Sequence, residues 1–290
     1  MLSKCVRYTL RKILRIRKYE TISANIRRRK TQFAKKIYKK PISRSQIYSV
    51  LKELGIKEGD NLLVHASWRD LYNFQGEPDE LIEVLRQILG GEGTLLMPSY
   101  GPTRSYLDVE CTPSSAGVLS EIFRLQPNTV RSACTHFSIS ASGKNAVELT
   151  KEHINSEYGF DHNSPYYLLS KFDNSKVLFI GLGKEPTQIS LFHCAGYLLK
   201  EKNPALANLL SYKYRSTLIK DKIQYEKEMV IRKPGHKNNN KVFKKILNSI
   251  NNRKHVRNSN VDFVLIDAKE GLNNAIEYAN KGIYCYKGIK

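Results

Sequence analysis

The chain lacks several features that would assign it quickly to a class of protein. No apolar run approaches the roughly 18 residues that span a bilayer, and the basic N-terminus has no continuous apolar stretch typical of a signal peptide. The five cysteines are far apart, odd in number and form no CxxC pair, which argues against a disulfide framework and a thiolate zinc site. We therefore expect a soluble protein of the cytoplasm with no metal.

Acidic residues are scarce as well: 27 Asp and Glu accompany 48 Lys and Arg, for a formal net charge of +21. A basic arm over 1–41 is the most one-sided part, with Glu20 as its one acid. Charge gathered in one segment predicts a local anionic partner. A short amphipathic helix is expected over Tyr8–Arg17, and it is equally consistent with an anionic membrane surface and with a solvated helix packed on the protein. Nucleic acid is less favoured, because no nucleic-acid-binding signature is present.

From residue 42 to 290 the pattern is that of one α/β domain. Ser43 and Gln46 form a capping box at the first helix. Strands alternate with helices, which predicts a largely parallel central sheet with helices on both faces. A charged, Asn-rich stretch over about 213–260 predicts a polar, mobile insertion. The expected strands are 61–65, 94–98, 137–141, 176–181, 263–267 and 283–286, and the other expected helices are 78–89, 118–125, 191–199 and 271–280.

Small and polar residues gather after the first two strands and before the helix at 118. Ligands of open α/β sheets bind beyond the carboxyl ends of strands, and small residues let backbone N–H groups approach an anion closely. An ordinary strand-to-helix turn is the alternative for the first of these patterns. The candidate binding residues are His65, Ala66, Ser67, Trp68, Ser99, Ser114, Ser115, Gly117 and Ser138.

His193 is the candidate general base, near the start of a predicted helix and soon after the strand that ends at Gly181. A histidine there can take a proton from an attacking amine. A purely structural role is equally consistent with a lone histidine. The neighbouring Cys194 offers a nucleophile instead, but adjacent side chains diverge on a helix.

Six blocks of sequence, in order, resemble the aminoglycoside 3-N-acetyltransferase family over residues 43–200, and more weakly to 290. The stretch Thr112–Ser132 is the most specific of them. The resemblance implies an α/β fold of its own and transfer of an acetyl group from acetyl-CoA to an amine of an amino sugar. The turn Val64–Ser67 would help to hold the CoA. The blocks are VHASW, GGEGTLLMPSY, TPSSAGVLSEIFRLQPNTVRS, YGFDHNSPY, KVLFIGLG and SLFHCAGY.

Two positions depart from the family pattern. The family's His-x-x-Glu motif falls on His193 to Gly196, so the glutamate that would orient a histidine or take the proton is a glycine here. A second family histidine aligns with Phe137, beside His136. Phe-Ser at this place resembles members that act in polysaccharide synthesis.

We expect another carboxylate to compensate for the missing glutamate. Asp161 and Glu157 are the candidates. The predicted catalytic residues are thus His193, Asp161 and His136, in a direct acyl transfer whose oxyanion is stabilised by backbone N–H groups.

The leading hypothesis is acetyl-CoA-dependent N-acetylation of an amino sugar that serves as a surface-polysaccharide precursor. A basic chain suits a phosphate-linked acceptor better than a polycationic drug, and the arm suits work at the inner face of the membrane. An aminoglycoside antibiotic is the alternative acceptor. A catalytically degenerate binding protein with the same fold is the rival from another class. A second copy of the chain, in a homodimer, is a further candidate partner.

Overall fold

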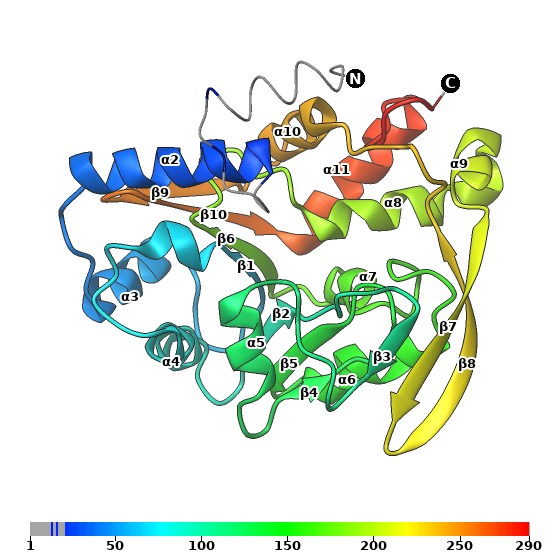
Figure 1. Ribbon diagram of the computed structural model, residues 1–290, viewed down its shortest axis with the longest axis horizontal. Coiled ribbons are helices and arrows are strands. Elements are labelled where there is room, and N and C mark those ends of the chain that lie inside the picture. Colours follow the sequence, from blue (N-terminus) through cyan, green and yellow to red (C-terminus); the bar gives the residue numbers. More distant parts are fainter. Residues whose placement is uncertain (1–12, 14–15, 17–20, 290) are drawn as a thin grey trace.

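The structure is a computed structural model that describes residues 13, 16 and 21–289 (Figure 1). The helix expected over Tyr8–Arg17 lies largely outside these residues. The basic arm enters the described part as helix α2 (Ile22–Ile37), which Thr21 caps by accepting a hydrogen bond from the Ala24 amide. No helix in the described ranges has the length and apolar character to cross a bilayer.

A seven-stranded sheet forms the centre of the described chain, in the order β4-β5-β2-β1-β6-β10-β9. The α/β class is confirmed, but within this sheet only the three central strands, β2, β1 and β6, pair in parallel. Strands β9 and β10 are joined by a tight turn, which forces an antiparallel pair. The strands are β1 (Asn61–Ala66), β2 (Thr94–Pro98), β4 (Val130–Arg131), β5 (Ile139–Gly143), β6 (Ser175–Ile180), β9 (Lys254–Asn258) and β10 (Val261–Asp267).

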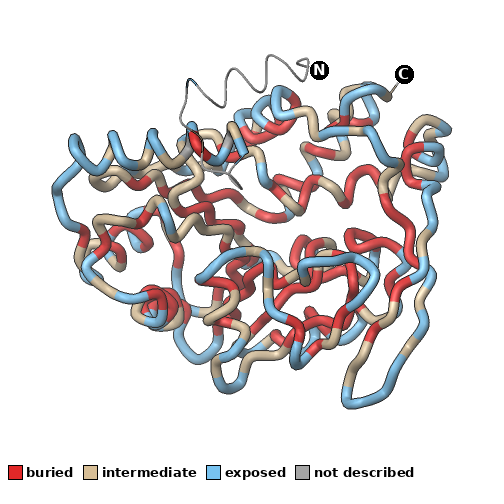
Figure 2. The backbone as a smooth tube through the Cα atoms, viewed as in Figure 1, coloured by how far each residue is buried: buried red, intermediate tan, exposed pale blue. Residues whose placement is uncertain are grey.

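Alternate residues of the central strands build a separate core on each face of the sheet. Leu62 and Leu178 pack into one core, while Leu63 and Val177 pack into the other, because successive strand side chains point to opposite faces. Figure 2 shows the buried strands between half-exposed helices. The first core is covered by α3 (Arg44–Glu53), α4 (Pro78–Leu89) and α5 (Val118–Arg124), and the second by α6 (Ala146–Thr150), α7 (Pro165–Leu169), α8 (His193–Leu198), α9 (Pro204–Leu209), α10 (Asn240–Asn248) and α11 (Ala268–Asn280).

Local signals in the sequence set several of these elements. The capping box of α3 is confirmed: Ser43 Oγ accepts from the Gln46 amide at 3.2 Å, and the Ser43 amide donates to Gln46 Oε1 at 2.8 Å. Helix α4 begins with Pro78 and ends at Gly90, whose φ of 63° suits glycine. Both boundaries agree with the expected helix over 78–89.

Most of the polar insertion expected over 213–260 is regular structure. A hairpin of β7 (Tyr212–Lys220) and β8 (Ile223–Ile231) pairs with β3 (Tyr106–Asp108) in a second sheet. Asp221 and Lys222 both have positive φ, as two-residue hairpin turns require. The irregular part is the connection from β8 to α10, residues 232–239, which we call the strap.

The strap pairs with the C-terminal segment, which does not join the central sheet. The Asn239 amide donates to the Cys285 carbonyl, and the Lys287 amide donates to the Lys237 carbonyl, each at 2.8 Å. A strand was expected over 283–286, and the structure has only an isolated bridge from Asn238 to Tyr286 in this part of the described chain. This pairing brings the end of the chain against α8.

Candidate active site

Two pockets meet at His193. The basic pocket has a volume of about 280 Å³ and the neutral pocket about 290 Å³, and both are lined by His193, Phe137 and Asn238. Two ligands can therefore approach one imidazole from different sides. The basic pocket is also lined by Arg104, His136, Tyr158, Phe160, Ile231, Arg232, Lys233, Pro234, Gly235, His236 and Tyr286. The neutral pocket is also lined by Val64, His65, Ala66, Pro98, Tyr100, Ala116, Ser120, Leu182, Gln188 and Ser190.

The neutral pocket lies where the parallel strands β1 and β2 end. Of the predicted binding residues, His65 and Ala66 line it. The His65 ring stacks on Phe179 with centroids 5.4 Å apart, and burial lowers the pKa of His65 to about 4. His65 is therefore uncharged near neutral pH, and the lining of this pocket has no ionised side chain.

The other predicted binding residues line neither pocket. The Ser67 hydroxyl donates to Asp70, and Trp68 packs edge-on against Phe74. Both side chains thus stabilise the turn after β1. The remaining residues shape the walls from behind: Ser138 Oγ donates to the Ser99 carbonyl, the Ser114 amide donates to Glu121, Ser115 Oγ donates to the Tyr100 and Gly101 carbonyls, and Gly117 begins α5 with a φ of 135°.

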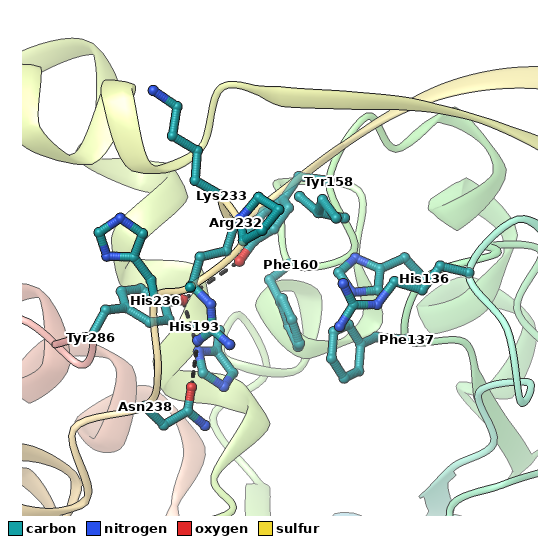
Figure 3. A pocket seen from close by; sticks show the side chains of 14 residues that line it. His136, Phe137, Tyr158, Phe160, His193, Arg232, Lys233, His236, Asn238 and Tyr286 are labelled. Atoms are coloured by element: carbon teal, nitrogen blue, oxygen red, sulfur yellow. Dashed lines mark hydrogen bonds between the residues drawn. The ribbon is translucent and has the colours of Figure 1, made fainter. Parts of the chain in front are cut away.

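His193 is the first residue of α8 and is held among aromatic rings. Its Nδ1 lies 2.8 Å from the Tyr286 hydroxyl, and the two rings stack with an interplanar angle of 18° (Figure 3). Phe160 and Phe243 contact it on other sides. Burial, together with the positive charge of Arg232, lowers the pKa of His193 to about 3. The imidazole is therefore neutral near pH 7 and able to accept a proton.

Tyr286 lies beside Gly196, the position at which the family pattern has glutamate. A Cβ atom added to Gly196 would meet Cε2 of Tyr286 at 3.4 Å. Glycine thus leaves room for a ring whose hydroxyl bonds His193, and burial raises the pKa of that hydroxyl well above 10, so it stays protonated. Nothing in the sequence pointed to Tyr286 as a partner of His193 beyond the missing side chain at Gly196.

The expected compensating carboxylates are not at His193. Asp161 is buried in a turn, where its two oxygens accept hydrogen bonds from Ser156, Glu157, Tyr158 and Asn163. Glu157 accepts from Tyr197 and Lys200, each at 2.6 Å. Neither lines a pocket, and no acidic residue lines the basic or the neutral pocket.

Cys194 lines neither pocket, and burial raises the pKa of its thiol. A thiolate nucleophile at this position has no support in the geometry. Across residues 21–289, no group of three or more His, Cys, Asp or Glu side chains is arranged to hold a metal ion.

His136 and Phe137 form the opposite wall of the basic pocket. The His136 side chain is only 6% exposed, yet neither ring nitrogen has a hydrogen-bond partner. Phe137 has a φ of 70°, a conformation that costs a bulky residue about 1–3 kcal/mol. Contacts with Tyr100 and Phe160 hold the Phe137 ring at the junction of the pockets. The predicted His136 is thus in the site, although no contact with His193 is recorded.

Arg232 is the main residue that the sequence did not indicate. It follows β8 directly, donates to Asn238 Oδ1 at 2.5 Å, and lies over the Tyr286 ring with its Cζ 5.0 Å from the centroid. Figure 3 shows Arg232 in front of His193, whereas the Lys233 side chain points away from it. Its position depends on the strap, which was expected to be mobile.

The fold is shared with solved acetyltransferase structures. AAC-IIIb, solved with CoASH, superimposes with a TM-score of 0.71 at 21% identity, covering 84% of this chain and 98% of that one. The apoenzyme of AAC(3)-IVa gives 0.67 at 23% identity, covering 83% and 89%. These matches define the class of fold: a mixed α/β acetyltransferase architecture.

Residues 63–280 match the family model described as aminoglycoside 3-N-acetyltransferase, and the chain belongs to this family. Aminoglycoside N(3)-acetyltransferase IV of Salmonella sp is 33% identical over 147 residues, 49% of this chain and 54% of the relative. The prophage-derived protein YokD of Bacillus subtilis (strain 168), named as aminoglycoside N(3')-acetyltransferase-like, is 27% identical over 182 residues, 54% of this chain and 65% of the relative. The matched chain thus spans about half to two-thirds of these relatives.

Proposed function

We propose that the protein transfers an acetyl group from acetyl-CoA to an amine. The observation that carries this proposal is the meeting of two pockets at one neutral histidine, His193, in a chain of this family. Acyl transfer between two substrates needs such a junction, because the thioester and the amine must reach the same point from different directions. Family membership supplies the identity of the donor.

The neutral pocket is the proposed site of the donor's reactive end. It lies beyond the carboxyl ends of β1 and β2, where α/β sheets bind ligands, and Ala66, Ala116 and Ser120 leave its wall open. The pantetheine arm is uncharged and bears amides, so it suits a lining that has polar groups but no ionised side chain. The predicted binding residues other than His65 and Ala66 would not contact the donor and would act only by shaping the wall of this pocket.

The reaction follows from the placement of His193. The amine nitrogen attacks the thioester carbonyl carbon, the tetrahedral adduct loses a proton from nitrogen to His193 Nε2, and the C–S bond breaks. The CoA thiolate leaves and takes the proton from the imidazolium. For Nε2 to accept this proton, the proton of the neutral His193 ring must be on Nδ1, which then donates to the Tyr286 hydroxyl. The Tyr286 hydroxyl can in turn donate to the Tyr158 hydroxyl 3.5 Å away. Tyr286 is thus a positioning residue that selects the tautomer of the base.

The relatives bear on the acceptor through their names. They are named for aminoglycosides, so the comparisons favour that acceptor class over the surface-polysaccharide precursor expected from the sequence. The membrane role of the basic arm and the homodimer stay predictions. For the arm, the described part offers an exposed Phe33 and Ile37 among the lysines of α2.

Purified protein tests the proposal in two measurements. Calorimetry with CoA should show saturable binding, and a thiol-release assay with acetyl-CoA should show turnover on at least one amine. Absence of CoA binding would refute the proposal. Binding without turnover on any amine would favour the degenerate binding protein instead.

A further inference from the structure

The two pockets differ sharply in charge. The basic pocket is lined by Arg104 and Arg232, and by Lys233, whose side chain points away from His193 and bonds Asn208, whereas the neutral pocket has no lysine or arginine in its lining. Neither lining includes an aspartate or a glutamate. Aminoglycosides carry several ammonium groups, and a pocket that offers cations and no carboxylate repels them. The acceptor side of this chain therefore has the wrong sign of charge for a polycation.

Arg232 is a half-buried cation with most of its hydrogen-bonding capacity unused. By contrast, the half-buried Arg124 pairs with Glu121, and the buried Arg131 donates to three backbone carbonyls. Arg232 has five N–H donors, and within residues 21–289 its recorded hydrogen bond is one contact with the neutral Asn238 amide. A guanidinium with free donors beside an active centre is suited to bind phosphate or carboxylate.

Two further groups face the same space. Arg104 has no hydrogen bond or ion pair recorded in the described part of the chain, and its charge contributes to lowering the pKa of His136. His136 is 6% exposed, and both of its ring nitrogens lack a partner. A neutral imidazole offers one donor and one acceptor, so a ligand that carries a hydroxyl beside a phosphate or carboxylate would satisfy both. Buried polar atoms without partners point to a ligand at this place.

The phosphates of CoA are the obvious rival occupant, and chain length excludes them. Arg232 contacts the ring of Tyr286, whose hydroxyl bonds His193, so the cation lies directly beside the reacting centre. In acetyl-CoA a full pantetheine arm separates the thioester from the pyrophosphate. With the thioester at His193, those phosphates lie far from Arg232. An anion at Arg232 therefore belongs to the other substrate.

We propose that the acceptor is a small amine that carries a phosphate or carboxylate a few bonds from its amino group, and that Arg232, with Arg104, binds this anion. The inference rests on the proposed acetyl transfer and specifies its substrate class. It departs from the polyammonium acceptors for which the relatives are named. The anion would also neutralise Arg232, one cause of the low pKa of His193, so acceptor binding would make the base stronger.

Calorimetry on the CoA-saturated protein separates the alternatives without needing turnover. The probes are glucosamine, glucosamine 6-phosphate, an amino uronic acid and kanamycin, at one pH and ionic strength. We expect glucosamine 6-phosphate to bind at least about tenfold more tightly than glucosamine. The affinity for the amino uronic acid then shows whether the pocket prefers a carboxylate or a phosphate. Tightest binding by kanamycin, or no gain from either anion, would overturn the inference and leave the proposed acetyl transfer standing. Failure to bind CoA would instead refute the acetyl transfer itself.

Three variants assign the anion to its residues. Arg232→Gln should reduce the preference for glucosamine 6-phosphate over glucosamine at least about fivefold, and Arg104→Gln, at an exposed position, should reduce it to a smaller extent. Arg215→Gln is the control for removing an arginine nearby, because Arg215 is exposed on the hairpin that leads into the strap and lines neither pocket. An Arg232→Gln protein that melts like the wild type but loses affinity for CoA, with its preference unchanged, would assign Arg232 to CoA and refute the proposal.

Discussion

The two pockets at His193 are built in different ways. The neutral pocket uses the ends of β1 and β2, elements whose bounds follow from short apolar runs in the sequence. The basic pocket uses the strap and Tyr286, which meet only because the strap pairs with the C-terminal segment. The neutral pocket is therefore a property of the sheet, whereas the basic pocket is a property of connections late in the chain.

Removal of the shared base should have the largest effect on catalysis. We expect His193→Ala to lower kcat by about 10²- to 10⁴-fold, the usual contribution of a general base. CoA affinity should change little, because the neutral pocket keeps its other walls. Thiol release and CoA calorimetry measure the two effects. Turnover at the wild-type rate would remove His193 from the mechanism and would contradict the proposal that the two substrates meet at this residue.

Filling the neutral pocket should separate donor from acceptor. A leucine at Ala66 would occupy space in the wall, so Ala66→Leu should raise the KM for acetyl-CoA at least about tenfold. Acceptor binding in the basic pocket should be spared. Ala207→Leu, on the exposed face of α9, is the control for adding the same side chain elsewhere. An unchanged KM for acetyl-CoA would show that the donor lies elsewhere.

Loss of the Tyr286 hydroxyl should have a smaller effect. Tyr286→Phe keeps the ring beside Gly196 but removes the hydrogen bond to His193, so kcat should fall by about threefold to tenfold. A merely structural role would leave the pH dependence of kcat unchanged, whereas a positioning role should shift its acid limb. Tyr158→Phe, one hydroxyl further from the base, should cost less. An equal loss in both variants would argue against direct positioning.

Burial of neutral histidines predicts an acid-sensitive fold on both sides of the junction. The folded-state pKa is about 4 for His65 and about 3 for His193, below the ordinary 6.5, so the unfolded chain binds more protons. Stability should therefore fall as pH drops from about 6.5 towards 4, by up to about 1.4 kcal/mol per pH unit for each histidine.

Urea unfolding at several pH values measures this dependence. His65→Gln should remove about one histidine's share of the slope, and His153→Asn, at a buried histidine outside both pockets whose pKa is about 3, should remove a similar share. If the slope of the His65→Gln protein matched that of the wild type, His65 would be charged or exposed in solution.

Prediction from sequence succeeded where the signal was local. The strand 94–98 and the helix 78–89 have the expected bounds, and the capping box at Ser43 is present. The strand expected over 283–286 failed, because its apolar residues pack against α8 and the strap instead of joining the sheet. Strand propensity is a local property, and it does not show whether an edge of the sheet will be available for the segment to pair with.

Part of the candidate site could be placed from the sequence for the same reason. His193, His136, His65 and Ala66 line the two pockets, since they lie near strand ends or a helix start, and their roles stay predictions. Asp161 was expected at the base, but its oxygens are used by the backbone of its own turn. The sequence does not show whether a carboxylate will accept hydrogen bonds from the backbone of its own turn or from a histidine elsewhere in the chain.

By itself, the sequence determined the α/β class, the family, the positions of the central strands and the histidine at their junction, because periodicity and short motifs act over a few residues. Only the tertiary structure decided that Tyr286 would occupy the space beside Gly196 and that Arg232 would lie over it. Residues 193, 232 and 286 are far apart along the chain, and long-range backbone pairing brings them together. The charge of the basic pocket therefore follows from that pairing and not from the net charge of +21.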